Sequence, residues 1–216
     1  MKARGAYAAL ALVAASALAC AQQAASTPPA SAKPHGEMCS EGECPMHAHK
    51  HGAGGEHAAR HAAIDRLIAI EAIQQLKARY MRCIDTKDLA CLHDTVFTPD
   101  TELYFKGGDY EIAVKGWPEI EKFYQGAFTP KKFGMHNVHT PEITVTGDTA
   151  TGIWYLHDVF VNLEQNTTLQ GSALYHDDYV KQNGAWRIAK STYTRLWEET
   201  TPRSDKTKLG SKPVKE

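Results

Sequence analysis

The chain has 216 residues, 24 basic and 25 acidic side chains, and a formal net charge of -1. This length favours one domain with additional segments, and the balanced charge gives no reason to expect nucleic acid as a partner. Hydrophobic residues make up 43% of the chain, which is enough for a core. Aromatic and β-branched residues are concentrated between residues 64 and 197.

The first twenty residues have the pattern of an export signal. Lys2 and Arg4 form a short basic region, and an apolar stretch follows over residues 6–18. This stretch is too short to cross a bilayer, which takes about 20 apolar residues, and it fits the apolar part of a secretory signal. We therefore expect residues 1–19 to be a signal peptide. The mature protein would be periplasmic or anchored to the outer membrane as a lipoprotein.

Cys20 decides between those two locations. It follows small residues, as in a bacterial lipobox, although Leu18 lies one place later than the usual large apolar residue. One interpretation is that Cys20 is acylated, and this lipid is the only membrane contact that we expect. The alternative is cleavage beside Cys20 with no lipid.

Residues 20–61 are rich in Ala, Ser, Pro, Gly and His and lack apolar periodicity, which predicts a disordered linker. Thiolate, thioether and imidazole groups suit copper(I) or zinc, but their spacing here matches no closed structural site. The alternatives are a tether with adventitious metal affinity, a physiological copper or zinc site, and a disulfide with idle histidines. The candidate metal ligands are Cys39, Cys44, His47, His49 and His51.

Four cysteines remain once Cys20 is removed or acylated, and four allow three pairings. The local pairs Cys39–Cys44 and Cys83–Cys91 require the least rearrangement of the chain. The second pair would close the turn after the first predicted helix. Two buried free thiols at these positions are the alternative.

Helices dominate the first part of the expected domain. Apolar residues at spacings of three and four predict an amphipathic helix over residues 64–84, with Lys77 on its polar side. Asp88 is a suitable N-cap for a second, short helix. A strand over residues 102–105 follows, and Pro118 lies in the first turn of a third helix.

After the third helix the apolar period changes to two, and Asn-Gly at 183–184 marks a tight hairpin. Helices followed by a run of strands predict an α+β domain over residues 62–198. In this fold a cone-shaped, curved antiparallel sheet packs on the N-terminal helices. Residues 199–216 are expected to form a flexible tail. The four predicted strands cover residues 135–146, 150–163, 167–181 and 185–197.

Three stretches of this domain resemble a known superfamily. They are residues 79–85 with the turn at 97–100, residues 135–152, and residues 184–188. Together they resemble the SnoaL-like, nuclear-transport-factor-2-like proteins, which implies a cystatin-like α+β roll around one pocket. That superfamily includes enzymes, binding proteins and members with no known activity, so the fold does not fix the function. Because such domains commonly dimerise through the open sheet face, the resemblance also implies a homodimer.

Within this superfamily the chain is most similar to the group of scytalone dehydratase, bile-acid 7α-dehydratase and hexachlorocyclohexane dehydrochlorinase. Those enzymes remove a proton and a leaving group with an Asp–His pair. The resemblance implies that Asp85 and His136 form this pair and that Tyr80 is a neighbouring catalytic residue. A carboxylate that orients a neutral imidazole gives a base suited to pH 7. Tyr80 or Tyr104 would donate to a carbonyl or leaving oxygen.

Three further residues are candidates for substrate binding: Tyr104, Tyr155 and His157. His157 shares a strand face with Tyr155, and it is either a second pocket histidine or a satisfied core histidine. His136 and His139 are three residues apart, so on a regular strand only one of them faces the pocket. The resemblance favours His136.

Three functions remain open. The first is a lyase or isomerase that abstracts a proton from a small hydrophobic molecule, with no cofactor expected for the domain. The second is a non-catalytic ligand-binding or accessory domain with the same fold. The third is a cell-envelope copper- or zinc-binding protein that acts through the N-terminal segment. Loss of turnover in His136→Ala, without unfolding, would favour the first.

Overall fold

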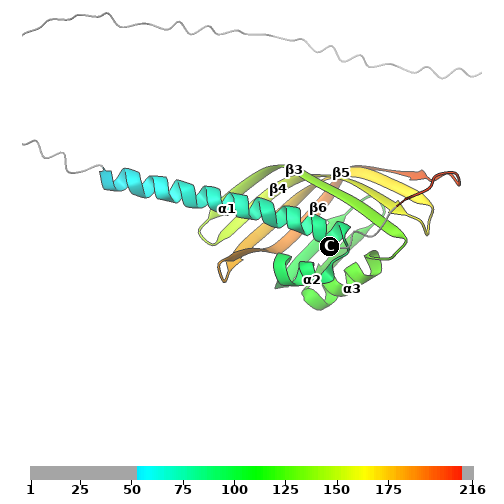
Figure 1. Ribbon diagram of the computed structural model, residues 1–216, viewed down its shortest axis with the longest axis horizontal. Coiled ribbons are helices and arrows are strands. Elements are labelled where there is room, and N and C mark those ends of the chain that lie inside the picture. The colour runs from blue at the N-terminus through cyan, green and yellow to red at the C-terminus, as the bar shows by residue number, and fades with distance from the viewer. Residues whose placement is uncertain (1–52, 211–216) are drawn as a thin grey trace, which may run out of the picture. The chain divides into compact units, whose positions relative to one another are not determined.

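The computed structural model describes residues 53–210 (Figure 1). Within this range, no helix combines the length and apolar character needed to span a bilayer. The predicted signal peptide, the predicted Cys39–Cys44 pair and the predicted lipid attachment lie outside it and stay predictions. The residues concerned are Cys20, Cys39, Cys44, His47, His49 and His51.

Four helical elements are present in the described range. They are α1 (Ala53–Asp85), the short α2 (Leu89–Cys91), the π-helical turn η1 (Leu92–Val96) and α3 (Trp117–Ala127). Asp88 caps α2 as predicted, because its carboxylate accepts a hydrogen bond of 2.8 Å from the backbone N–H of Cys91.

Helix α1 begins at Ala53, inside the stretch predicted as linker. Its first turns lack large apolar residues, so apolar periodicity gave no signal there. They are instead rich in Ala, which has the highest helix propensity. Arg60 and Glu56 also form an ion pair of 2.8 Å across one turn. Local propensity therefore predicts this part of the helix better than the apolar pattern does.

Six strands form one curled, mixed sheet in the order β2-β1-β6-β5-β4-β3. The α+β prediction is confirmed, but the sheet is not wholly antiparallel, because β1 and β6 run parallel. These two strands are joined by most of the domain instead of by a hairpin, so no turn fixes their relative direction. The strands are β1 (Phe97–Lys106), β2 (Glu111–Lys115), β3 (Lys132–Thr146), β4 (Thr149–Asn162), β5 (Thr167–Gln182) and β6 (Ala185–Pro202).

The strand predictions differ from the structure at the edges. The apolar pattern did not predict β2, a five-residue edge strand whose pairing to β1 stabilises it. At the other end, β6 continues to Pro202, into the stretch predicted as tail, where Thr201 pairs with Thr168 of β5. Polar edge segments such as these lack the apolar alternation that identifies a strand from sequence.

The core lies between α1 and the concave face of the sheet, and α3 lies beside α2 near the C-terminal end of α1 (Figure 1). Ile73, Leu76 and Tyr80 are fully buried at helical spacing on α1. Ile64 and Ile68, on the same helix, remain 51% and 63% exposed. The sheet therefore covers only the later turns of α1, and the first turns project beyond it (Figure 1).

Lys77 lies in this core, although the apolar pattern of the helix places it on the polar side. Its ammonium donates to Asp177 of β5 over 2.7 Å, and both side chains are fully buried. Asp177 also accepts from the hydroxyls of Tyr179, at 2.7 Å, and Ser191, at 2.6 Å. Burial lowers the pKa of Lys77, and the charge and hydrogen bond of Asp177 oppose this effect. The sheet wraps around more of α1 than one apolar stripe, so a lysine with a carboxylate partner is accommodated inside.

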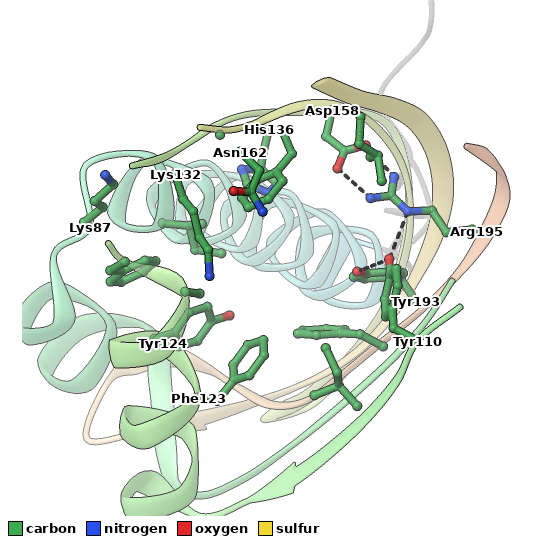
Figure 2. A pocket seen from close by; sticks show the side chains of 18 of the residues that line it. Lys87, Tyr110, Phe123, Tyr124, Lys132, His136, Asp158, Asn162, Tyr193 and Arg195 are labelled. Carbon is green, nitrogen blue, oxygen red and sulfur yellow. Dashed lines mark hydrogen bonds and ion pairs between the residues drawn. The ribbon is translucent and has the colours of Figure 1, made fainter. Parts of the chain in front are cut away.

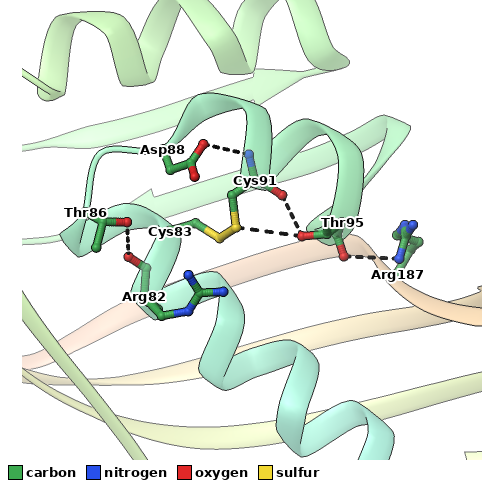
Figure 3. The surroundings of a disulfide bond; sticks show 7 residues. All are labelled: Arg82, Cys83, Thr86, Asp88, Cys91, Thr95 and Arg187. Atoms are coloured by element: carbon green, nitrogen blue, oxygen red, sulfur yellow. Dashed lines mark hydrogen bonds between the residues drawn. A yellow bond between two sulfur atoms is a disulfide. The ribbon is translucent and has the colours of Figure 1, made fainter. Parts of the chain in front are cut away.

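The predicted disulfide between Cys83 and Cys91 is confirmed, with 5.8 Å between the two Cα atoms (Figure 3). It ties the last turn of α1 to α2. Thr95 of η1 contacts this region through its hydroxyl, which donates to the carbonyl of Cys91 over 2.7 Å. Arg187 of β6 in turn donates to the carbonyl of Thr95 over 3.1 Å. The end of α1 is therefore fixed covalently and through hydrogen bonds to the sheet.

Candidate functional site

A cavity of about 370 Å³ lies on the concave side of the sheet (Figure 2). Its walls come from both α1 and α3 and from each of the six strands. Nine of its 23 lining residues are aromatic, which suits a small apolar ligand. The aromatic lining residues are Tyr80, Phe105, Tyr110, Phe123, Tyr124, Phe128, Phe160, Tyr175 and Tyr193.

The structure brings Asp85 and His136 together. Asp85 is the last residue of α1, and His136 lines the cavity from β3. The imidazole Nδ1 and one carboxylate oxygen are 2.6 Å apart, and the other oxygen accepts the backbone N–H of His136 over 3.1 Å. A carboxylate can only accept, so Nδ1 carries a proton, and in the neutral imidazole the lone pair is then on Nε2. Within residues 53–210, no hydrogen bond engages Nε2.

A glycine makes room for this imidazole. A Cβ at Gly134 would lie 2.8 Å from Cε1 of His136 and 3.5 Å from a carboxylate oxygen of Asp85. The first of these separations is too short for real atoms, so any side chain at this position would displace the ring. Gly134 therefore allows His136 to lie flat against its own strand while Nδ1 reaches Asp85.

Tyr80 lines the same cavity from α1 and is fully buried. Its hydroxyl lies 2.9 Å from that of Tyr124 on α3. Burial raises the pKa of Tyr80 well above its usual value, and the neighbouring Tyr124 and Tyr175 raise it further. Both phenols are therefore protonated at physiological pH, and one of them has a hydroxyl proton left to donate to a ligand.

A second polar group faces the cavity beside His136. Asp158 of β4 is the cross-strand partner of His136 in the β3–β4 register, so the two side chains project on the same face as close neighbours. The guanidinium of Arg195 binds the Asp158 carboxylate with two parallel hydrogen bonds, one of them 2.7 Å long (Figure 2). Such a fork holds the arginine in one orientation.

Arg195 comes from β6 and crosses β5 to reach Asp158. A Cβ at Gly171 of β5 would lie 3.1 Å from its Nη1, so the missing side chain leaves the path open. Its Nε donates to the hydroxyl of Tyr110 over 3.1 Å, and that hydroxyl lies 2.7 Å from the hydroxyl of Tyr193. Burial by itself lowers the pKa of Arg195, but the hydrogen bonds and charge of Asp158 raise it overall. The result is a fixed, permanently positive group at the cavity wall.

Two lysines complete the rim. Lys132 donates to the carbonyl of Gly126 over 3.2 Å, and Lys87 donates to the carbonyl of Thr129 over 2.8 Å. Partial burial lowers the pKa of Lys87. Both amines contact the end of α3 and the loop after it, so their positions follow the packing of α3 against the sheet.

None of the three predicted substrate-binding residues, Tyr104, Tyr155 and His157, lines this cavity. Tyr104 alternates with the buried Leu103 and Phe105 of β1, and its hydroxyl donates to Glu111 over 3.0 Å. Tyr155 and His157 lie on the exposed face of β4. Both faces of β4 carry apolar residues, so alternation separates the faces without telling which one is inside.

The polar residues that sequence reasoning missed as site residues are Asp158, Arg195, Tyr110 and Tyr124. Asp158 was missed because the sequence pattern placed His157 on the inward face of β4. The two residues alternate along the strand, and in the structure Asp158 is the inward one. Arg195 lay in an assigned strand, where a charge reads as solvent-facing. Its contact with Asp158 joins β6 to β4 across β5. Residues near Arg195 in the sequence therefore give no sign of this contact. His139, in contrast, is exposed and packs its ring on Tyr155, as expected for the histidine that faces away.

The described part of the chain holds no cluster of three or more His, Cys, Asp or Glu side chains with metal-binding geometry. Two hydrogen-bonded pairs of acidic and basic side chains, Asp85–His136 and Asp158–Arg195, lie at the cavity wall. The first pair can orient a base, and the second can hold a fixed positive charge. Together they can support proton transfer and stabilise the negative charge that develops beside it.

The fold and this cavity define a pocket-bearing α+β domain. The family model of the SnoaL-like domain matches residues 65–192, so the chain belongs to the SnoaL-like family. The match covers α1 from Asp65 onward and most of the sheet, including both polar pairs except Arg195.

Several solved structures are similar to this one. Hexachlorocyclohexane dehydrochlorinase LinA-type3 from Novosphingobium barchaimii shares 19% identity over 69% of this chain and 99% of its own, with a TM-score of 0.57. A protein assigned as a scytalone dehydratase from Novosphingobium aromaticivorans shares 18% identity over 69% of this chain and 95% of its own, with a TM-score of 0.53. A protein of unknown function from Mycobacterium tuberculosis shares 27% identity over 62% of this chain and 75% of its own, with a TM-score of 0.51. These likenesses establish the fold.

Proposed function

We propose that this protein is an exported lyase or isomerase that abstracts a proton from a small, mostly hydrophobic molecule. The observation that carries the proposal is the 2.6 Å contact between Asp85 and Nδ1 of His136 at the wall of an aromatic cavity. Export rests on the sequence of residues 1–20 alone. The dehydrochlorinase and dehydratase among the similar structures add support at the level of reaction class.

In this proposal Nε2 of His136 takes a proton from a substrate carbon next to an electron-withdrawing group. The electrons of the broken C–H bond form a double bond to the adjacent carbon. The bond from that carbon to the leaving group breaks at the same time, and the leaving group takes the electron pair of that bond. In an isomerase the proton returns to another carbon. Asp85 holds the proton on Nδ1 and stabilises the imidazolium that forms. The acid that assists the leaving oxygen is Tyr80 or its partner Tyr124, which burial keeps protonated.

Arg195 supplies the charge that this step needs. Negative charge grows on the substrate as the proton leaves, and a fixed guanidinium next to the base stabilises it. Asp158 keeps the guanidinium in place through the two-pronged contact and leaves some of its N–H groups for a ligand. We expect a substrate with a carbonyl or another oxygen close to the acidic C–H, and an apolar body that fits the aromatic walls.

The experiment measures proton abstraction directly, so the identity of the leaving group is not needed. Ligands that raise the melting temperature of the domain are incubated with the protein in D₂O, and deuterium uptake at carbon and product formation are followed by NMR. A positioned base contributes about 10²–10⁴ in rate, so His136→Ala should lower both by that factor. His139→Ala, on the same strand but outside the cavity, is the matched control and should behave as wild type.

Urea unfolding of both variants separates lost chemistry from lost folding. Equal deuterium uptake in wild type and folded His136→Ala would refute the base assignment. Ligands that bind in the cavity but show neither uptake nor turnover with the wild-type protein would instead support a non-catalytic binding domain. The copper or zinc function of residues 35–61 is a separate prediction that these measurements do not test.

We further propose that the domain forms a homodimer through the exposed face of the sheet. Met135 and Tyr155 are 47% and 41% exposed there, and Trp197 of β6 is 50% exposed. Apolar side chains gathered on one face favour burial by a second copy. Light scattering of the wild type and Tyr155→Glu tests this, since a charge in the interface should give a monomer. A monomeric wild type would refute it.

A further inference from the structure

The first turns of α1 carry two histidines that the cavity does not use. His57 and His61 are four residues apart, so on the observed helix their side chains lie one above the other on the same face. Both residues are exposed. Within residues 53–210, neither imidazole takes part in a hydrogen bond or an ion pair. The sequence pattern predicts a linker for these histidines, in which no such geometry exists.

Two imidazoles at this spacing on a helix can bind one metal ion together, as the two histidines of helical zinc motifs do. Neutral imidazole is a good ligand for zinc, nickel and copper(II). We propose that His57 and His61 form a two-imidazole binding site for a divalent transition-metal ion. Because the described residues offer no group of three ligands, the other coordination positions are open to water or to further donors.

The surroundings of the pair leave this site accessible. The nearest cation along the helix, Arg60, is engaged by Glu56 over 2.8 Å, which neutralises its charge. Residues 58 and 59 are alanines, so Arg60 is the one large side chain between the two histidines in the chain. Farther along the same stripe, Ile64 and Ile68 are largely exposed, which shows that the domain does not cover this face. Figure 1 shows this end of α1 beyond the edge of the sheet.

Binding has a structural consequence. The first turns of a helix have few backbone hydrogen bonds to hold them, and here they also lack packing against the sheet. A metal held by residues in successive turns can stay bound only while that helical segment is formed. Metal binding must therefore stabilise the start of α1 by mass action. The dipole disfavours a cation near a helix N-terminus, but this effect is small beside two metal–imidazole bonds.

The test is zinc-dependent amide hydrogen exchange of the mature full-length chain, read on peptides from the first turns of α1. At a free zinc concentration ten times the Kd, exchange there should slow about tenfold. The decisive variant is Ala59→His with His61→Ala, which keeps the number of histidines but places the second imidazole on the opposite side of the helix. His176→Ala, an exposed histidine of β5, is the control for the loss of one histidine.

We expect zinc protection in the wild type and in His176→Ala, and none in the shifted variant or in His61→Ala. Each variant is compared with its own zinc-free exchange, so a change in helix propensity does not affect the result. Absence of zinc protection in the wild type would overturn the proposal. Equal protection in the shifted variant would also overturn it, because binding would then not depend on the helical pair.

Discussion

Two pairs of acidic and basic side chains join α1 to the sheet, about two helical turns apart along the helix. Their contact distances are similar, but the pairs differ in burial and in the groups that they leave available. Lys77–Asp177 spans 2.7 Å and Asp85–His136 spans 2.6 Å. The first pair is fully buried, whereas the side chains of His136 and Asp85 are 18% and 28% exposed. Contact length alone therefore says nothing about role.

The difference lies in what each pair leaves unused. Asp177 has partners on both oxygens, and the Lys77 ammonium also lies 3.5 Å from the centre of the Tyr175 ring. No group of that pair is left for a ligand. In the other pair, His136 lines a cavity, and its Nε2 has no hydrogen-bond partner among residues 53–210. A satisfied, buried pair thus holds the helix to the sheet, whereas an unsatisfied one at a cavity is available for chemistry.

Breaking the buried pair should have the largest effect on stability. Lys77→Met leaves the Asp177 carboxylate inside the protein without its cation, which typically costs about 3–5 kcal/mol. Urea unfolding measures this loss. Lys131→Met, an exposed lysine of the loop before β3, should change stability by no more than about 0.5 kcal/mol. If the two variants were equally stable, the structural role of the buried pair would be disproved.

Removing the disulfide should have the next largest effect. Cys83 and Cys91 are 8 residues apart, and the loop-entropy relation then gives about 2–3 kcal/mol. The double variant Cys83→Ala with Cys91→Ala isolates this bond from the other cysteines of the chain. Because the closed loop contains Asp85, hydrogen exchange around that residue should also become faster. A variant as stable as wild type would mean that the bond does not constrain the unfolded chain.

High pH should weaken the region around the buried pair. Burial raises the pKa of five tyrosines above the usual value near 10. The folded protein therefore keeps protons that the unfolded chain loses. Their contribution is complete below pH 10 and falls above it by up to about 1.4 kcal/mol per pH unit for each tyrosine. The five residues are Tyr80, Tyr124, Tyr175, Tyr179 and Tyr193.

Ultraviolet absorbance of tyrosinate, followed together with unfolding, checks this prediction. These phenols should ionise only as the protein unfolds, in one cooperative step. Gradual ionisation near pH 10 with the fold intact would show that the tyrosines are accessible to solvent and would contradict their burial.

Breaking the partly exposed pair should have the smallest effect on stability. Asp85→Asn keeps the size of the side chain and one acceptor for the backbone N–H of His136. Partly solvated polar contacts of this kind contribute about 0–1 kcal/mol. We therefore expect a change of less than about 1 kcal/mol by urea unfolding, with loss of the proposed proton abstraction. A loss as large as that of Lys77→Met would place this pair among the structural contacts.

The sequence was most informative where a local signal exists. Helical spacing placed Asp85 at the end of α1, and the family resemblance paired it with His136, with which it is in contact in the structure. Asp88 showed its capping role through its position alone. These features depend on neighbours along the chain or on a shared motif, and both are visible in one sequence.

The sequence was least informative about contacts across the sheet. Asp158 and Arg195 meet across β5 at Gly171, which leaves room for the arginine side chain, and no spacing in the sequence indicates that path. The sequence also did not determine which face of β4 turns inward, since Trp154 and Tyr155 are equally plausible core residues. The helical pattern predicts that Lys77 is exposed, because Asp177, its partner in the structure, is distant in the sequence. A charged side chain is buried where a partner compensates its charge, so its own position in a helical pattern does not predict whether it is buried.

The central claim is that Asp85 keeps the proton of His136 on Nδ1, so that Nε2 is a free base at the cavity. Nitrogen NMR of the histidine side chains, in wild type and in Asp85→Asn, reads the tautomer directly. We predict a protonated Nδ1 and an unprotonated Nε2 in the wild type, and a mixture of tautomers in the variant. A proton on Nε2 in the wild type, or the same spectrum in both proteins, would contradict this claim.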